Sequence, residues 1–369
     1  MGLNKAIELA VVGADIYTIC QAVDTLMEAE THKVFNSKKT KKLDRGIAFP
    51  CCISLNNTVG HYSPLSDESQ VLKEGDLAKI ICGAQLDGFA GIAAHTIIVG
   101  NNGNAEGRKA DVIVAAHNCM MAAQRIIKDG STNVEVTEAM NKICEDHNVN
   151  MVEGVLSHTV KKFCIDGNNV INSKETGESH VETWIFAPGD VIGMDIYVST
   201  GEGKTKPAEC RTTVYKREIQ NMYNLKINKS RQFFAEANKK FPSLPFSLRA
   251  FEDQTGAKVG IRECVDHELM IPYPVLEEKN GEFVAHFKCT IAVLPKSTAI
   301  LAGDIKFDAT KMKCENVLKD AEMKTLIASD MWVKEKKAKK WRKEMYTRFW
   351  WFKETGLSQK ERELTIWIK

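Results

Sequence analysis

The stretch GDLAKIICGAQLDGFAGIAAHTIIVG, residues 75–100, decides the fold. It contains two runs rich in β-branched and apolar residues, 77–86 and 89–99, with only Asp87-Gly88 between them. An Asp-Gly dipeptide between two such runs is a strong signal for a two-residue hairpin turn, because both turn positions need a positive φ. The sequence therefore predicts a β-hairpin over residues 77–99.

The turn also predicts which residues of the hairpin face each other. With Asp87-Gly88 as the turn, Ile81 pairs with Ala94 and Ile92 pairs with Gly83. Ile81 and Ile92 are then diagonal neighbours on one face, roughly 7–8 Å apart. Two carboxylates at such positions could share a dinuclear metal site, whose ions sit about 3.5–4 Å apart. Isoleucine cannot ligate a metal, and an isoleucine on a strand is usually an ordinary core residue.

A second segment of the chain echoes the first. GDLAKII at 75–81 is matched by GDVIGMD at 189–195, and a turn-rich stretch follows each. Ile81 and Asp195 stand at the same place in the two copies. The echo predicts two related αβ halves. Helical spacing covers residues 3–36, 110–127 and 136–147, and strand character returns at 282–294.

Composition limits the class of protein. The apolar share of 44% and charged share of 27% are those of a globular chain, and 369 residues allow one large domain or two ordinary ones. A net charge of +2 gives no global field toward nucleic acid, so such a role needs local patches. The eleven cysteines show no repeated spacing, which fits reduced thiols. Glu8 and Asp15 interrupt the first apolar stretch, so we expect a soluble intracellular protein without membrane association.

Several segments resemble those of a known family in both their amino-acid sequence and their order along the chain. AFPCCISLNNTVGHYSP (48–64), the hairpin, VEGVLSH (152–158), GDVIGMD and EFVAHFKCT (282–290) resemble landmarks of type 2 methionine aminopeptidases over roughly residues 20–310. A non-peptidase branch of that family, the proliferation-associated proteins of eukaryotes, is closer still, as in STGEGK (199–204), RTTVYKRE (211–218) and PFSLRAFED (245–253).

The resemblance implies an architecture. The fold class is α+β, a pita-bread fold of two pseudo-symmetric αβ halves with a helical insertion. Residues 1–209 and 273–310 are predicted to form the pita-bread domain. Residues 210–272 are predicted to form the helical insertion, and residues 311–369 a C-terminal extension with a basic tail.

The resemblance also assigns a former metal site. The family's peptidases hold two divalent ions with two Asp, one His and two Glu. By position these ligands fall on Ile81, Ile92, His158, Asp195 and Lys288, while a substrate-side histidine falls on His61 and a further active-site histidine on Asp166. Divalent cations need anionic oxygen, and here three carboxylates are lost and an ammonium is gained. We therefore expect no metal, no cofactor and no peptidase activity.

The same residues allow a prediction of geometry. All five ligand positions should meet in one cavity, with Lys288 paired to Asp195 because an unpaired buried carboxylate is costly. His61 and His158 could instead be ordinary hydrogen-bonded core histidines.

Basic clusters occur at residues 38–42, in the insertion and at 334–343. Clustered Lys and Arg give salt-dependent affinity for nucleic acid, although charge runs are more often solvated faces. The candidate nucleic-acid-binding residues are Lys229, Arg231, Lys239, Lys240, Lys334, Lys336, Lys337, Lys339 and Lys340. Phe233, Phe234, Phe241 and Phe246 have helical spacing that favours a core role over base stacking.

The resemblance implies an RNA- and ribosome-binding protein of growth regulation, ribosome biogenesis or translation control. It also implies a location in cytoplasm, nucleus and nucleolus, with nuclear protein partners, and the basic run at 334–343 suits nuclear import. Two alternatives stay open. One is a metal-dependent methionine aminopeptidase with an unusual ligand set, and the other is a protein-only scaffold such as a transcriptional corepressor.

Overall fold

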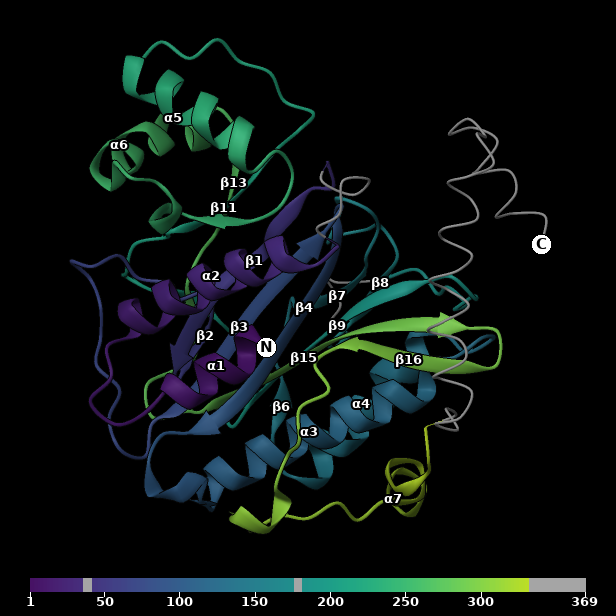
Figure 1. Cartoon of the computed structure of the whole chain (residues 1–369). Helices are drawn as coiled ribbons and strands as arrows, with labels where there is room; N and C mark the ends of the chain where they lie inside the picture. Colours follow the sequence, from purple (N-terminus) through teal and green to yellow (C-terminus); the bar gives the residue numbers. More distant parts are fainter. Residues whose placement is uncertain (36–41, 176–180, 332–369) are drawn as a thin grey trace. The chain divides into compact units, whose positions relative to one another are not determined.

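The structure, a computed structural model, describes residues 1–35, 42–175 and 181–331. Within these residues the largest element is a nine-stranded sheet, whose continuous part has the order β1-β3-β4-β15-β9-β7-β8 (Figure 1). The strands on this path are β1 (Arg45–Leu55), β3 (Leu77–Leu86), β4 (Phe89–Ile98), β15 (Val284–Leu294), β9 (Val191–Ser199), β7 (Leu156–Thr159) and β8 (Val170–Asn172). β16 (Ser297–Ala302) pairs with β15, and β6 (Asn150–Met151) pairs with β9.

The predicted hairpin and its register are confirmed. β3 and β4 are antiparallel, with Ile81 opposite Ala94 and Gly83 opposite Ile92. The two turn residues, Asp87 and Gly88, have φ values of 54° and 81°, as a tight turn of this kind requires.

Four helices cover one side of the sheet strands. α1 (Gly2–Leu9) and α2 (Ile16–Lys33) pack on β1 and β3, where Ile80 belongs to their shared core. α3 (Arg108–Ile126) and α4 (Asn133–Asp146) form a second core with β9 and β15, which includes Met194. Because side chains alternate along a strand, the neighbours Ile81 and Asp195 point to the opposite side, away from these helices.

The Gly-Asp echo has the same local geometry in both halves. Gly75 and Gly189 both have positive φ, 81° and 108°. Gly75 N donates to Val99 O at 2.8 Å, and Gly189 N donates to Val293 O at 2.9 Å. In each copy the same valine returns a hydrogen bond of 2.9 Å to the main-chain oxygen of the aspartate after the glycine. The prediction of two related halves is confirmed.

Two threonines join the halves at the seam between β4 and β15. Thr290 Oγ1 donates to Ile92 O at 3.0 Å and accepts from Ile92 N at 3.1 Å. Thr96 Oγ1 donates to His286 O at 2.7 Å and accepts from His286 N at 2.8 Å. Side-chain hydroxyls therefore satisfy main-chain groups on both sides of the direct Lys288–Ala94 pairing.

The insertion is only partly helical. It contains α5 (Asn228–Lys240) and α6 (Gln254–Asp266), but also a separate sheet of order β12-β11-β13. These strands, β12 (Phe246–Ser247), β11 (Val214–Arg217) and β13 (Met270–Tyr273), are too short to show a period in the sequence. Phe233 and Phe246 are buried in the core of the insertion, and Phe234 and Phe241 pack against it, so their predicted core role is confirmed.

The chain returns to the main body after residue 310. β17 (Met312–Lys313) pairs with β5 (Ala105–Glu106), and Met323 of α7 (Ala321–Ala328) is buried against α3 and α4. Asp111 accepts hydrogen bonds from Glu315 N at 2.9 Å and Asn316 N at 3.1 Å. Residues 1–329 form one compact unit, which takes in the first part of the predicted extension, and the division of the chain into domains stays a prediction.

The remaining elements are short. β10 (Lys206–Pro207), β14 (Leu276–Glu277) and β2 (Thr58–Gly60) form a small sheet, and one-turn helices occupy 101–103, 248–250 and 309–311. Among the described helices, none has the length and apolar character that a membrane crossing requires. The predicted basic-tail residues, Lys334, Lys336, Lys337, Lys339 and Lys340, lie outside the described residues.

Candidate functional site

A cavity of about 240 Å³ lies on the strand face that carries Ile81 and Asp195. All five positions that the resemblance assigns to metal ligands line it, although they are far apart in sequence: Ile81, Ile92, His158, Asp195 and Lys288. His61 and Asp166 line it too. The predicted convergence on one cavity is confirmed as geometry, whereas any functional role of these residues stays a prediction.

One side of the cavity is apolar. Ile81 and Ile92 are 4% and 5% exposed and belong to a cluster that includes Phe49 and Ala94. Val160, Ile165 and Tyr273 pack against that cluster from other segments. The hairpin positions therefore contribute packing to the cavity wall and offer no lone pair to a cation.

The other side holds a buried charge cluster. Asp195 and Lys288 are directly opposite each other on β9 and β15, and the Lys288 ammonium donates to Asp195 Oδ2. His286 Nε2 is 2.6 Å from Asp195 Oδ1, and the His286 side chain is 1% exposed. The predicted Asp195–Lys288 pair is confirmed, and it has a third member.

The neighbouring charges and the depth of burial determine the protonation states of Asp195 and His286. Burial alone would raise the pKa of Asp195, but the Lys288 ammonium and then His286 outweigh it and hold that pKa well below its usual range. Burial lowers the pKa of His286 despite the attraction of Asp195. At neutral pH the neutral His286 ring therefore donates its Nε2–H to Asp195.

Sequence reasoning missed His286, although a signal was present. In a strand, residues two apart share a face, so His286 lies on the same face as Lys288. Its ring stacks on Tyr197 of β9, with ring centroids 3.7 Å apart and planes inclined by 10°. Tyr197 holds the imidazole in the orientation that reaches Asp195.

Lys79 is a second residue that the sequence did not predict. It lies on β3 two residues before Ile81, is 2% exposed, and its ammonium donates to Asn56 O at 2.8 Å. Burial lowers the pKa of Lys79 well below its ordinary value. Lysine is seldom fully buried, so the apolar run that contains it gave no hint.

The cavity histidines are held by main-chain carbonyls. Nδ1 of His158 is 3.1 Å from Gly167 O, and Nδ1 of His61 is 3.3 Å from Pro274 O. Burial lowers the pKa of His61 to about 4, so its ring is neutral at pH 7. Both bonds agree with hydrogen-bonded structural histidines. Asp166, at the family's further histidine position, instead pairs with Lys216 of β11.

Comparison with known proteins gives this cavity its context. The sequence profile of metallopeptidase family M24 matches residues 2–215. The chain belongs to this family. It is 41% identical to proliferation-associated protein A of Dictyostelium discoideum over 340 residues, 92% of this chain and 87% of that protein. It is 37% identical to the curved DNA-binding protein of Schizosaccharomyces pombe over 343 residues, 91% of this chain and 88% of that protein. The resemblance to the proliferation-associated branch is confirmed.

Solved structures agree with the fold. A thermophilic Arx1 matches with a TM-score of 0.83 and 28% identity, over 90% of this chain and 95% of that one. A methionine aminopeptidase of Thermotoga maritima matches with a TM-score of 0.53 and 18% identity, over 82% and 91% of the two chains. The second likeness concerns the fold alone. Together they confirm the predicted α+β pita-bread fold.

The residues of this M24 cavity do not fit the family's metal pair. Asp195 is the one carboxylate among the five ligand positions, and both of its oxygens are already bonded to Lys288 and His286. The part of the chain that the structure describes contains no group of three or more His, Cys, Asp or Glu side chains that could hold a metal ion. Two divalent cations would also meet the Lys288 ammonium directly.

The candidate cations of the insertion lie on α5 but do not share one face. At about 100° per residue, Lys229 and Lys240 fall on one side of the helix, while Arg231 and Lys239 lie toward the other. Lys229 pairs with Asp253 at 3.3 Å, and Lys240 with Glu236 at 2.7 Å. The Arg231 guanidinium donates to two main-chain oxygens before the helix. All four side chains are exposed, and their binding role stays a prediction.

Proposed function

We propose that this protein is a catalytically inactive M24 protein that binds RNA and the ribosome and acts in growth regulation, ribosome biogenesis or translation control. The observation that carries the loss of catalysis is the Lys288 ammonium, bound to Asp195 where the peptidases require an anionic ligand. Hydrolysis in this family depends on metal-activated water, and the opposite wall of the cavity is Ile81 and Ile92.

Binding of nucleic acid rests on different support. A relative that covers nearly the whole chain is named a curved DNA-binding protein. The insertion presents exposed lysines and arginine on α5, and Lys226, two residues before the helix, is exposed as well. Exposed cations within one short segment can neutralise phosphates with little sequence preference. We propose that the protein works in cytoplasm and nucleus, including the nucleolus, where ribosomal RNA is available.

Catalysis can be tested on the purified full chain. We expect no stoichiometric metal by elemental analysis and no cleavage of a Met-initiated peptide with added cobalt or manganese. Lys288→Glu should not restore cleavage, because Ile81 and Ile92 still provide no ligand. Cleavage by the wild-type chain with a bound metal pair would instead support the metal-dependent aminopeptidase.

RNA binding can be tested by ribosome co-sedimentation across a salt series. Charge reversal of Lys229, Arg231, Lys239 and Lys240 should weaken association at least tenfold and flatten its salt dependence, because fewer counterions are released. The matched control reverses four exposed lysines outside the insertion, Lys73, Lys142, Lys319 and Lys324. Equal effects of the two sets would remove α5 from the binding face. No association of the wild-type chain with ribosomes or RNA would favour the protein-only scaffold.

A further inference from the structure

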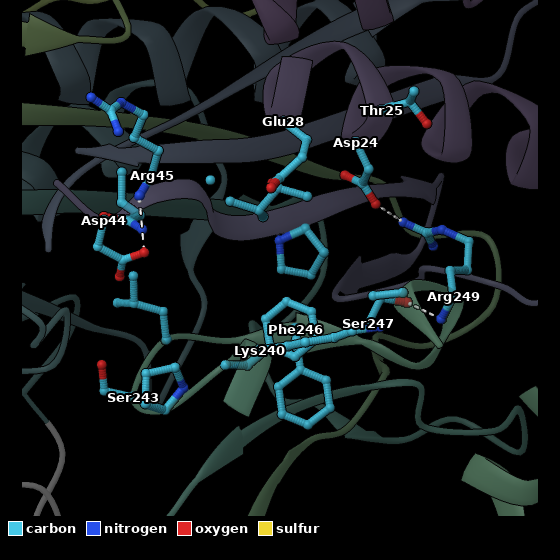
Figure 2. Close-up of a pocket in the computed structure, with 18 of the residues that line it drawn as sticks. Asp24, Thr25, Glu28, Asp44, Arg45, Lys240, Ser243, Phe246, Ser247 and Arg249 are labelled. Atoms are coloured by element: carbon cyan, nitrogen blue, oxygen red, sulfur yellow. Dashed lines mark hydrogen bonds and ion pairs between the residues drawn. The ribbon is translucent and has the colours of Figure 1, made fainter. Parts of the chain in front are cut away.

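A second and larger pocket lies where α2, the start of β1 and residues 240–250 of the insertion meet (Figure 2). We call it the α2 pocket; its volume is about 470 Å³. Asp24, Glu28 and Asp44 bring three carboxylates to its lining. Figure 2 shows Asp24 and Glu28 descending from α2 on one side, with Phe246 facing them from the insertion.

Of these three carboxylates, Asp24 already has a buried cationic partner. The Arg249 guanidinium, whose side chain is 2% exposed, forms a 2.5 Å ion pair with Asp24. The same guanidinium donates to Cys51 O at 3.2 Å and to the Ser63 hydroxyl at 2.5 Å. This buried network joins the insertion to α2 and β1 at the lining of the α2 pocket.

The other two cations at the pocket are also engaged elsewhere. Lys240 pairs with Glu236 on its own helix. The Arg45 guanidinium donates to the carbonyls of Val34 and Leu43, and Figure 2 shows its side chain leading away from Asp44. Among the described residues, no ion pair joins either cation to Glu28 or Asp44.

Glu28 and Asp44 are therefore left without a strong cationic partner among the described residues. The ring of His32 on the same helix is 3.8 Å from Glu28 Oε1 and counts as a cation only when it is protonated. The Asp44 carboxylate accepts the main-chain N–H of Arg45 at 2.9 Å and forms no ion pair with a described residue. Glu28 also lies so close to β1 that a Cβ on Gly46 would be 2.9 Å from its Oε2. Burial, together with the charges of Asp44 and Asp24, raises the pKa of Glu28.

A buried amide gives an independent sign of a ligand. Gln85 lines the pocket and is only 5% exposed. Its Oε1 accepts the N–H of Gly88 at 2.8 Å, which leaves the Nε2 amide as a donor into the pocket. Among the described residues Nε2 has no acceptor, and it is not one of the side-chain nitrogens that are fully buried without a partner, so it is accessible from the pocket.

We propose that the α2 pocket binds a lysine or arginine side chain of a partner protein. Glu28 and Asp44 would receive the cation, while Pro50, Phe163 and Phe246 would pack on its aliphatic stem. The Gln85 amide would donate to a carbonyl of the partner's main chain. A polyamine has no such carbonyl, and phosphate would be repelled by the carboxylates. A metal ion does not fit, because the described residues offer no three-ligand group.

Fluorescence anisotropy with the full chain tests the proposal. The probe is an acetylated octapeptide in which lysine and arginine alternate with alanine, and the comparison peptide has glutamine at every basic position. We expect saturable binding of the basic peptide only, weakened at least tenfold in the double variant Glu28→Gln, Asp44→Asn and a few-fold in Gln85→Leu. The matched control is Glu138→Gln, which removes the same charge from an exposed position on α4 and should leave binding unchanged.

Each contrary outcome overturns the proposal. These outcomes are failure of the wild-type chain to bind the basic peptide, equal affinity of the double variant and Glu138→Gln, and displacement of the peptide by spermine at the peptide's own concentration. Ribosome co-sedimentation of the double variant should be unchanged, so the result is independent of the proposed RNA binding. Thermal unfolding of each variant distinguishes lost binding from lost folding.

Discussion

In the first half of the sheet, Ile81 of β3 and Ile92 of β4 face the cavity; in the second half, Asp195 of β9 and Lys288 of β15 face it. The strands that carry them have the same turn geometry at the Gly-Asp pairs and the same side turned to the helices. One half presents apolar side chains to the cavity, and the other presents a charge and its counterion. The backbone therefore does not depend on cavity chemistry.

The reason for this tolerance lies on the other side of the strands. Ile80 in the first half and Met194 in the second belong to large cores with the helices, and both are fully buried. The two clusters beneath the helices contain more buried apolar residues than the cluster at the cavity wall, and burial of apolar side chains is the main stabilising contribution to a fold. Substitutions on the cavity face change the local charge balance and leave the architecture in place.

The largest expected effect on stability comes from breaking the Asp195–Lys288 pair, which only the second half contains. Lys288→Ala leaves Asp195 as a buried carboxylate without its main counterion, so we expect the free energy of unfolding to fall by about 3–5 kcal/mol. Urea unfolding measures this loss. It should be smaller at pH 6 than at pH 8, because His286 can take up a proton in the absence of Lys288.

The control removes both charges at once. The double variant Asp195→Asn, Lys288→Met should recover most of the stability lost in Lys288→Ala, because no buried charge is left uncompensated. If the double variant were as unstable as the single one, the pair would contribute through packing and the comparison of the halves by charge would fail.

A smaller difference concerns acid sensitivity. The pKa of His286 is lowered in the folded state, so between pH 7 and 5 the unfolded chain, with a histidine pKa near 6.5, binds a proton that the folded chain does not. Stability therefore falls as pH falls, by up to about 2 kcal/mol for this one residue. His286→Gln keeps a donor to Asp195 but does not titrate.

The measurement is urea unfolding at pH 7 and pH 5 for wild type and His286→Gln. We expect a shallower pH dependence in the variant. His61, with a pKa of about 4, adds to the acid sensitivity of both proteins and cancels in the difference. Identical pH dependence of the two proteins would mean that His286 titrates normally in the folded cavity.

The smallest expected loss of stability concerns the Gly-Asp turn, which both halves contain. Gly75 and Gly189 have positive φ, and a Cβ on either meets no atom within 4 Å. Gly75→Ala and Gly189→Ala should therefore each cost about 1 kcal/mol, from backbone strain alone. Gly88→Ala is the contrasting variant and should cost more, because its Cβ would be 2.6 Å from the Phe163 ring. Unequal losses at the paired glycines would show that the two turns are not equivalent.

The sequence predicted the parts of the cavity that depend on neighbouring residues. A two-residue turn fixes the register of both strands, so the positions of Ile81 and Ile92 followed from Asp87-Gly88 alone. The Gly-Asp echo placed Asp195 on the equivalent strand. The charge of Lys288, together with the family resemblance, then predicted its pairing with Asp195.

Only the tertiary structure decided the rest, because strand order and depth of burial are not local properties. The participation of His286, the burial of Lys79 and the short strands of the insertion depend on segments far apart in the chain. The α2 pocket likewise combines three segments that are far apart in the chain, α2, β1 and the insertion, which Arg249 joins through its pair with Asp24. The sequence by itself determined the two halves and the chemistry that each carries. The fold determined which of those groups meet, because the strength of a buried charge's interactions depends on the groups buried beside it.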